Sequence, residues 1–260
     1  MIDFLINSVI PKETQMSAKS DKYEKDVADA IDATPGVTAE RPKVSTKYAD
    51  ILIKEHNSKK VTSPVWVEVK MSHTDNLGNP RVSWDGKTWN ASFAPGEKSP
   101  IKEFAIKYLS ESREVKKFIA DLAKFSGIKN PKIPTTKGGL KDPDAVPLDV
   151  MKKFFQNKNQ YILDIKNVDL GKMVTQHYLV GKEEPAYYMQ AGDDFYKIGN
   201  KNPLKLSANI PLLSGRGDFK MRIGLRTEFY EVQPEIKIVK MPYSNFSIKP
   251  GTKKKNPFEK

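Results

Sequence analysis

Short segments in which apolar and polar residues alternate recur along much of this 260-residue chain. Alternation with a period of two is typical of half-buried β-strands, because successive strand side chains point to opposite faces. KYADILIK (47–54) and PVWVEVKMS (64–72) alternate in this way, and the polar sequence HNSKK lies between them. We therefore predict that these two strands pair as an antiparallel hairpin.

Apolar residues recur at helical spacing in two longer segments. In residues 22–32, Asp21 with Glu24 three residues later forms a capping-box-like start. The predicted apolar stripe of this helix consists of Tyr23, Val27, Ala30 and Ile31. Residues 99–125 show the same spacing, with a break expected near residues 110–112.

A further hairpin signal lies in RVSWDGKTWN (81–90). Asp85-Gly86 between alternating residues favours a two-residue type I′ turn, which would pair Trp84 with Lys87. The result would be a small β-ribbon that leaves the end of the preceding strand.

The second half of the chain is predicted to be largely β. Residues 126–147 are rich in Pro, Gly, Lys and Thr, which indicates an ordered loop or a mobile linker, and a short helix follows at 148–157. The candidate strands are NQYILDI, QHYLVG, AYYMQA, DFYKIG, FKMRIGLRTEFYEV and EIKIVKM. We expect the basic tail KPGTKKKNPFEK to be disordered.

These elements predict an α/β protein of the α+β kind, in three parts. Residues 1–125 form the core, 126–147 the loop or linker, and 148–260 a β-rich basic part that is either separate or continuous with the core. No apolar run approaches the roughly 18 residues that a membrane span needs, and the start lacks the pattern of a signal peptide. We therefore expect a soluble, cytoplasmic protein with no membrane partner.

Charge and composition narrow the chemistry. The net charge of +12 is concentrated in residues 151–260, which carry +9 of it and therefore indicate a polyanionic partner such as nucleic acid. A basic surface that only confers solubility is the alternative. The chain has no cysteine and 3 histidines, so any metal is expected to be a hard cation bound by oxygen.

The hairpin carries the candidate chemistry. If the apolar faces of both strands point into one core, Asp50, Glu68 and Lys70 emerge together on the other face. Two carboxylates, with the Val69 carbonyl between them, suit Mg²⁺, which prefers oxygen ligands and retains space for water and phosphate. Such a site can hydrolyse a phosphodiester, with Lys70 orienting the nucleophile or stabilising the phosphate. A solvated strand face with a Glu–Lys ion pair is the alternative.

At these residues the chain resembles the PD-(D/E)XK nuclease superfamily, over roughly residues 20–125. That pattern is an acidic residue on one strand, E-x-K on the next, and an upstream helix that often adds a Glu. The resemblance implies a restriction-endonuclease-like mixed sheet flanked by helices, with Asp50 and Glu68 as metal ligands, Lys70 as catalytic lysine and Glu24 in an accessory metal role. Ala49 stands where the motif's name has Pro.

Two basic regions are candidates for DNA binding. Arg81 and Lys87 lie on the predicted ribbon, which has a size suited to the major groove, although its tryptophans also suit simple packing on the domain. The segment GRGDFKMRIGLR places basic residues on one strand face opposite apolar ones, and a solvated face is the alternative there. The candidate contacts in that segment are Arg216, Lys220, Arg222 and Arg226.

Together these features predict a Mg²⁺-dependent endonuclease of double-stranded DNA, of restriction or phage type, in which Mn²⁺ replaces Mg²⁺. A junction resolvase or a nicking repair nuclease is the alternative within the same chemistry. Cleavage of both strands by one site per chain would suggest a homodimer. Outside this chemistry, a non-catalytic nucleic-acid-binding protein and a virion or assembly protein remain open.

Overall fold

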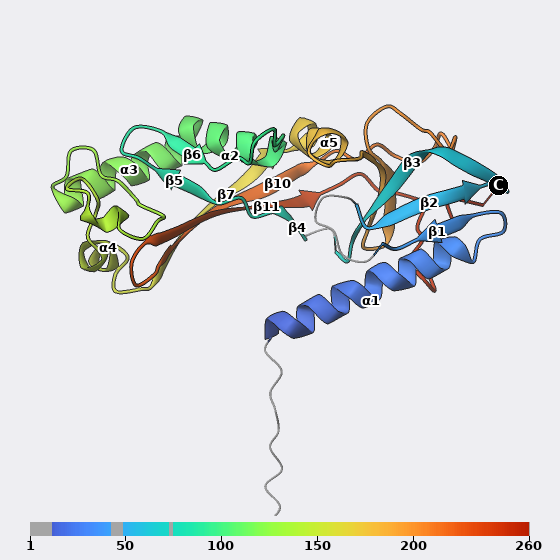
Figure 1. Cartoon of the computed structure of the whole chain (residues 1–260), viewed down its shortest axis with the longest axis horizontal. Coiled ribbons are helices and arrows are strands. Elements are labelled where there is room, and N and C mark those ends of the chain that lie inside the picture. Colours follow the sequence, from blue (N-terminus) through green and yellow to red (C-terminus); the bar gives the residue numbers. More distant parts are fainter. Residues whose placement is uncertain (1–11, 43–48, 73–74, 260) are drawn as a thin grey trace, which may run out of the picture. The chain divides into compact units, whose positions relative to one another are not determined.

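The structure is a computed structural model that describes residues 12–42, 49–72 and 75–259 (Figure 1). The chain divides into two compact units, each assembled from segments that are far apart in the sequence. Unit 1 consists of Met1–Ser72, Ala186–Pro211 and Tyr243–Lys260, and unit 2 consists of His73–Pro185 and Leu212–Pro242. Among the described residues, no helix is both long and apolar enough to cross a membrane.

Unit 1 contains a five-stranded mixed sheet with the order β1-β2-β3-β8-β9. Its strands are β1 (Thr38–Glu40), β2 (Ile51–His56), β3 (Lys59–Lys70), β8 (Ala186–Ala191) and β9 (Asp194–Lys197). Strands β3 and β8 are parallel and all other neighbours are antiparallel. With the helices described below, the fold is of the mixed α/β kind that the sequence predicts.

The parallel pairing of β3 with β8 corrects the predicted domain boundaries. The sequence interpretation assigns residues 186–211 and 243–260 to a C-terminal part, whereas these segments complete the unit that contains the hairpin. The reason is that a parallel pair needs a crossover connection. Here that connection is the whole of residues 73–185, which fold as part of unit 2.

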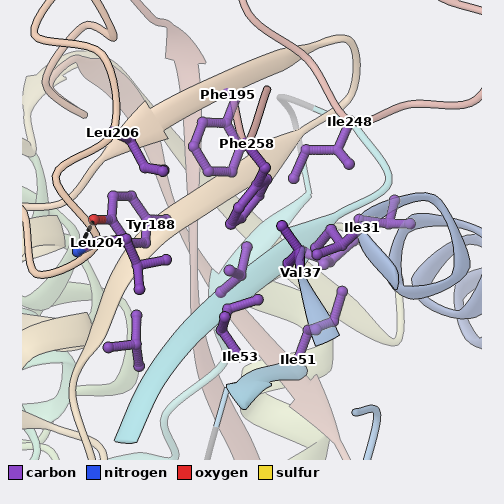
Figure 2. Packing of buried hydrophobic residues seen from close by; sticks show 14 of the residues in the cluster. Ile31, Val37, Ile51, Ile53, Tyr188, Phe195, Leu204, Leu206, Ile248 and Phe258 are labelled. Carbon is purple, nitrogen blue, oxygen red and sulfur yellow. Dashed lines mark hydrogen bonds between the residues drawn. The ribbon is translucent and has the colours of Figure 1, made fainter. Parts of the chain in front are cut away.

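The predicted hairpin of β2 and β3 is confirmed. Ile51 pairs with Val67 and Ile53 with Val65, and a tight turn at Asn57–Ser58, with φ of 54° and 57°, joins the strands. Lys47 and Tyr48 of the predicted first strand lie outside the described residues. Alternate residues of both strands enter one core with residues from β8, β9 and the C-terminal segment (Figure 2).

The apolar core face of β3 ends sooner than predicted. Val65, Val67 and Val69 are buried in the core as expected, but Met71 lies beyond the end of the strand and is 38% exposed. The opposite face is buried as well, since Trp66 and Glu68 are 4% and 3% exposed. The second half of β3 is therefore an interior strand on both faces.

Helix α1 (Lys12–Asp32) packs beside β1 and β3 (Figure 1). Val27 and Ile31 are fully buried, which confirms the predicted stripe. The predicted start at Asp21 is wrong, because the helix begins nine residues earlier, at Lys12. Glu24 therefore lies within the helix and is not part of a capping box at its beginning.

The C-terminal tail is ordered, which corrects the prediction of disorder. Phe258 is 3% exposed and its ring centroid lies 5.9 Å from that of Phe195. The Asn256 side chain donates a hydrogen bond of 2.8 Å to the hydroxyl of Thr34. A single large apolar side chain near the end of a polar tail is enough to anchor it, because burial of a phenylalanine contributes on the order of 2 kcal/mol.

Unit 2 contains a four-stranded sheet, a two-stranded ribbon and four α-helices within the described residues. The four-stranded sheet has the order β4-β11-β10-β7, from β4 (Asn76–Gly78), β11 (Tyr230–Lys240), β10 (Arg216–Leu225) and β7 (Gln160–Asp169). The ribbon is β5 (Val82–Trp84) with β6 (Trp89–Ala91). The helices are α2 (Pro100–Glu111), α3 (Arg113–Ser126), α4 (Leu148–Phe154) and α5 (Gly171–Val180).

Several predictions hold for unit 2. The long helical segment is broken at Ser112, which caps α3 by accepting a hydrogen bond from the Val115 N–H. Residues 126–147 form an ordered loop with a short 3₁₀ helix (Gly139–Lys141), because Ile133 and Val146 are fully buried.

Two assignments in the second half are wrong. QHYLVG belongs to helix α5, in which Val174 and Tyr178, four residues apart, are both fully buried. FKMRIGLRTEFYEV is not one strand, because the chain turns at residues 226–229 and forms the β10–β11 hairpin. QHYLVG is too short an apolar run to distinguish a strand from a helix. In the second segment the turn at residues 226–229 contains none of the Gly, Pro, Asn or Asp residues that usually mark a turn.

The ribbon forms with a different register from the one predicted. Trp84 pairs with Trp89, so four residues rather than two connect the strands. The Asp85 carboxylate accepts hydrogen bonds from the N–H groups of Lys87 and Thr88, at 2.9 and 2.8 Å. This side-chain capping places Gly86, with φ of 96°, at the first central position of the turn.

The packed tail yields a stability prediction. Phe258→Ala should lower the free energy of unfolding by about 3 to 4 kcal/mol, because it removes a buried aromatic ring from the core of unit 1. Urea denaturation measures the change, and Glu259→Ala, at an exposed neighbour, is the matched control. Equal stability of the two variants would show that the tail does not pack in solution.

Candidate functional site

The structure brings together the acidic and basic residues of the β2–β3 hairpin. Asp50 lies one residue before β2, and its Oδ2 accepts a hydrogen bond of 2.7 Å from the Val69 N–H. Glu68 and Lys70 flank Val69 at the end of β3. The carboxylate of Asp50 is therefore held against the strand that carries the other two side chains, as the alternation predicts.

Glu68 is a buried charge with a close partner. The residue is 3% exposed, and its Oε1 lies 2.7 Å from the Lys70 Nζ, whose side chain is 23% exposed. A carboxylate in the interior costs several kcal/mol of desolvation unless a cation compensates it. Lys70 supplies this compensation while its ammonium keeps access to solvent.

Asp50 has an unusual protonation equilibrium. Burial raises the pKa of Asp50 from 3.8 to about 7, and the nearby carboxylate of Glu68 acts in the same direction. The ammonium of Lys70 and the Val69 N–H oppose this rise, and Glu24 adds to it. Two carboxylates that repel one another in a poorly solvated place fit a divalent cation, which would favour the charged form of both.

Glu24 lies near this cluster but is engaged by another cation. Its Oε2 lies 2.6 Å from Nη2 of Arg41, and its Oε1 accepts a hydrogen bond of 3.2 Å from Ser20. The same guanidinium contacts Asp21 at 2.8 Å. Arg41 thus links helix α1 to the segment after β1, and Glu24 has a structural role beside its electrostatic influence on Asp50.

The candidate metal ligands are few. Within residues 12–42, 49–72 and 75–259, no group of three or more His, Cys, Asp or Glu side chains is arranged to hold a metal ion. The predicted metal ligands are only two side chains, those of Asp50 and Glu68, together with the Val69 carbonyl. Such a set leaves most coordination positions of Mg²⁺ to water and substrate oxygens, as is usual for this ion.

Residues that the sequence interpretation missed hold the end of β3 in place. The Gly192 N–H donates a hydrogen bond of 2.8 Å to the Lys70 carbonyl, and the Gly192 carbonyl accepts one of 2.6 Å from the Tyr23 hydroxyl. The fully buried Gln190 side chain bonds the same carbonyl at 2.8 Å and accepts from the Ile248 N–H. A lone glutamine in the apolar strand AYYMQA was the one available signal.

Carboxylates pair with part of the basic face of β10, which the sequence offers as a candidate DNA surface. Phe219, Met221 and Ile223 are fully buried, so the predicted alternation is confirmed. The basic residues, however, pair across the sheet. Lys220 Nζ lies 3.7 Å from Asp164, Arg222 Nη2 lies 2.5 Å from Glu235, Arg226 pairs with Glu231, and Arg216 donates to the Asn167 side chain and carbonyl.

The ribbon residues are more accessible. The Arg81 side chain is 81% exposed, with Glu231 at 3.8 Å, and Lys87 is exposed in the turn capped by Asp85. Both side chains are therefore accessible to a ligand of unit 2.

Comparisons of the chain with protein-family models, with curated proteins and with solved structures find no match.

The raised pKa of Asp50 gives a stability prediction in metal-free buffer. The unfolded chain loses this proton near pH 4 and the folded chain near pH 7, so the contribution of protonated Asp50 to stability is lost between these values as the pH rises. Asp50→Asn, which stays neutral, should therefore gain stability over the wild type across this window, on the order of 2 kcal/mol. Urea denaturation of both proteins in EDTA at about pH 4, 5.5 and 8 measures this difference in stability. If the difference does not grow with pH, the raised pKa of Asp50 is wrong.

The ion pair of Glu68 gives a second prediction. Lys70→Met should destabilise the protein by about 2 to 4 kcal/mol at neutral pH, because it removes the ammonium beside a buried carboxylate. The double variant Glu68→Gln/Lys70→Met should recover most of this loss. Lys54→Met, which breaks the exposed pair with Glu40, is the control and should cost below about 1 kcal/mol. Equal losses for Lys54→Met and Lys70→Met would show that Glu68 is solvated.

Proposed function

We propose that the protein is a Mg²⁺-dependent DNA endonuclease with a restriction-endonuclease-like core in unit 1. The observation that carries the proposal is the arrangement at the end of β3, where Asp50 is bonded to the Val69 N–H and Glu68 contacts Lys70. An ammonium and two carboxylates are groups that metal-assisted phosphodiester hydrolysis can use.

The mixed sheet and its helix support this core. The acidic hairpin occupies central positions in the order β1-β2-β3-β8-β9, and helix α1 precedes it and carries Glu24. These are the elements that the resemblance to PD-(D/E)XK nucleases implies.

In this mechanism Asp50, Glu68 and the Val69 carbonyl would hold the metal. Such an ion would supply an activated water and offset negative charge at the scissile phosphate. Asp50 must be ionised to act as a ligand, so metal affinity rises as the pH increases through about 7. Mn²⁺, which also prefers oxygen ligands, can substitute for Mg²⁺ in this role.

Lys70 has two roles in the proposed mechanism. Without metal, its ammonium compensates Glu68, at 2.7 Å. With substrate, the same ammonium would contact the phosphate or the attacking water, because a bound cation would compensate Glu68 in its place. Glu24 supports the site through its charge, although Arg41 holds its carboxylate.

Duplex DNA is the proposed substrate because the chain carries a net charge of +12. The ion pairs on β10 reduce the contribution of Lys220 and Arg222 to that binding. Arg81 and Lys87 are the exposed contacts that the proposal assigns to phosphate or guanine in unit 2.

Incubation of supercoiled plasmid with the protein and roughly 5 to 10 mM Mg²⁺ tests the proposal. We expect cleavage by the wild type, and losses of at least about a hundredfold for Asp50→Asn, Glu68→Gln and Lys70→Gln, which remove metal ligands or the catalytic ammonium. Discrete fragments would indicate sequence specificity.

Lys54→Gln is the matched control, since Lys54 lies on the same hairpin but pairs with Glu40 on the exposed surface. It should retain wild-type cleavage. If linear, supercoiled, single-stranded and branched DNA all remain intact in Mg²⁺ and Mn²⁺, the catalytic assignment is wrong and Glu68 and Lys70 form a structural pair.

A further inference from the structure

A groove with a volume of about 700 Å³ lies on unit 1, between the β8–β9 turn and the C-terminal segment. We call it the C-terminal groove and define it by Asp193, Asn209, Tyr243, Lys249, Lys253 and Lys255, which line it. None of these residues belongs to the candidate metal site. The groove is therefore a separate feature of the unit that the proposed function does not use.

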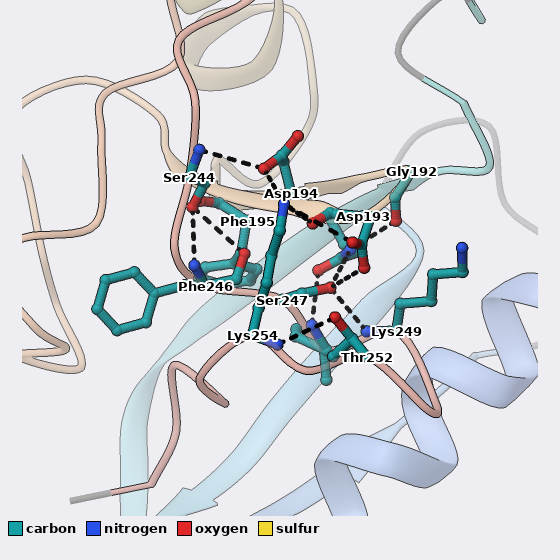
Figure 3. Close-up of polar contacts among 12 residues, drawn as sticks. Gly192, Asp193, Asp194, Phe195, Ser244, Phe246, Ser247, Lys249, Thr252 and Lys254 are labelled. Carbon is teal, nitrogen blue, oxygen red and sulfur yellow. Dashed lines mark hydrogen bonds and ion pairs between the residues drawn. The ribbon is translucent and has the colours of Figure 1, made fainter.

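The backbone around the groove is held by a polar network (Figure 3). Lys254 donates to the Asp193 carbonyl at 2.7 Å and to the Asp194 carboxylate at 2.6 Å. Ser244 donates through its N–H to Asp194 and through its hydroxyl to the Phe195 carbonyl. The chain that carries the groove's lysines is thus fixed to the sheet at several points.

The groove is positively charged. The side chains of Lys249, Lys253 and Lys255 are exposed, while Asp193 is the acidic residue of the lining. The Asp193 carboxylate accepts a hydrogen bond of 3.3 Å from the Ser247 hydroxyl and lies 3.7 Å from Lys254 Nζ. Lys254 also pairs with Asp194, at 2.6 Å, so four lysines face two aspartates here. The net positive charge that remains fits phosphates of a nucleic-acid strand.

An aromatic ring lies at the same place. Tyr243 is 72% exposed, and the Nζ of Lys254 lies 5.0 Å from its ring centroid. A large ring that is this exposed stabilises the fold little, yet the contact with a fixed lysine orients it. An oriented aromatic face among lysines is the arrangement that binds single-stranded nucleic acid, in which an unpaired base stacks on the ring.

The groove adjoins the candidate catalytic strand. The Gly192 N–H donates to the Lys70 carbonyl at 2.8 Å, and the next residue, Asp193, lines the groove. The groove therefore begins one residue away from the backbone contact that holds the end of β3.

We propose that the C-terminal groove binds an unpaired segment of the DNA substrate, with phosphates on Lys249, Lys253 and Lys255 and a base stacked on Tyr243. The inference rests on the proposed nuclease function and narrows its substrate to DNA in which a single-stranded segment lies near the scissile phosphate. Flaps, frayed ends and branched junctions have such a segment, and fully paired DNA does not.

Binding in EDTA, where no cleavage occurs, tests the groove by fluorescence anisotropy with a labelled single strand of ~12 nucleotides and a fully paired, blunt-ended duplex of ~12 base pairs. The groove variant Lys249→Ala/Lys253→Ala/Lys255→Ala should reduce the slope of log affinity against log salt concentration by about 2 for the single strand. The control variant Lys59→Ala/Lys60→Ala/Lys201→Ala removes the same charge from exposed positions of unit 1 outside the groove and should keep the slope.

The aromatic contact is tested separately. Tyr243→Ala should weaken single-strand binding by about tenfold or more, because one stacked base is lost, whereas Tyr243→Phe should bind like the wild type. Binding of the fully paired duplex should be affected much less by Tyr243→Ala, because its bases already stack on one another.

Equal slopes for the groove and control variants, or equal single-strand affinities of Tyr243→Ala and Tyr243→Phe, would overturn the inference. If Tyr243→Ala lowers the affinity for the single strand and for the duplex equally, the assignment of the groove to unpaired DNA is wrong. If binding behaves as expected but no DNA is cleaved in Mg²⁺, the proposed nuclease function is wrong and the binding role of the groove is supported. If DNA is cleaved but the groove variants bind like the wild type, only the binding role of the groove is wrong.

Discussion

The burial of a carboxylate in the central strand of a sheet is the constraint on which unit 1 depends. Glu68 lies on β3, whose second half is paired on both edges and buried on both faces. A carboxylate in that position is costly unless a cation compensates it. Lys70 does so from two residues away, on the same face of the same strand.

The same constraint explains Asp50. Its carboxylate approaches the strand closely enough to accept the Val69 N–H, and burial together with Glu68 raises its pKa to about 7. The site thus combines one ion pair with one carboxyl group that a cation would ionise. A solvated strand face of alternating charges would show neither this burial nor the raised pKa of Asp50.

Distant segments keep this arrangement rigid. The Gly192 backbone connects the Lys70 carbonyl to the Tyr23 hydroxyl of α1, and Gln190 connects β8 to the C-terminal segment.

The charged residues of unit 2 are arranged differently. There Lys220 and Arg222 of β10 face carboxylates on β7 and β11, whereas Arg216 bonds the uncharged Asn167. In the C-terminal groove the lysines outnumber the aspartates, so that segment keeps a net positive charge.

The sequence by itself determined the local features of this protein. Alternation over a few residues was enough for the β2–β3 hairpin, for its core face and for the convergence of Asp50, Glu68 and Lys70, because these depend on neighbours in the chain. Only the tertiary structure decided which strand lies beside β3, that Phe258 anchors the tail and that Glu235 offsets Arg222. Each of these contacts joins positions far apart in the sequence or on opposite strands of a sheet, and no local pattern of side chains specifies such a partner.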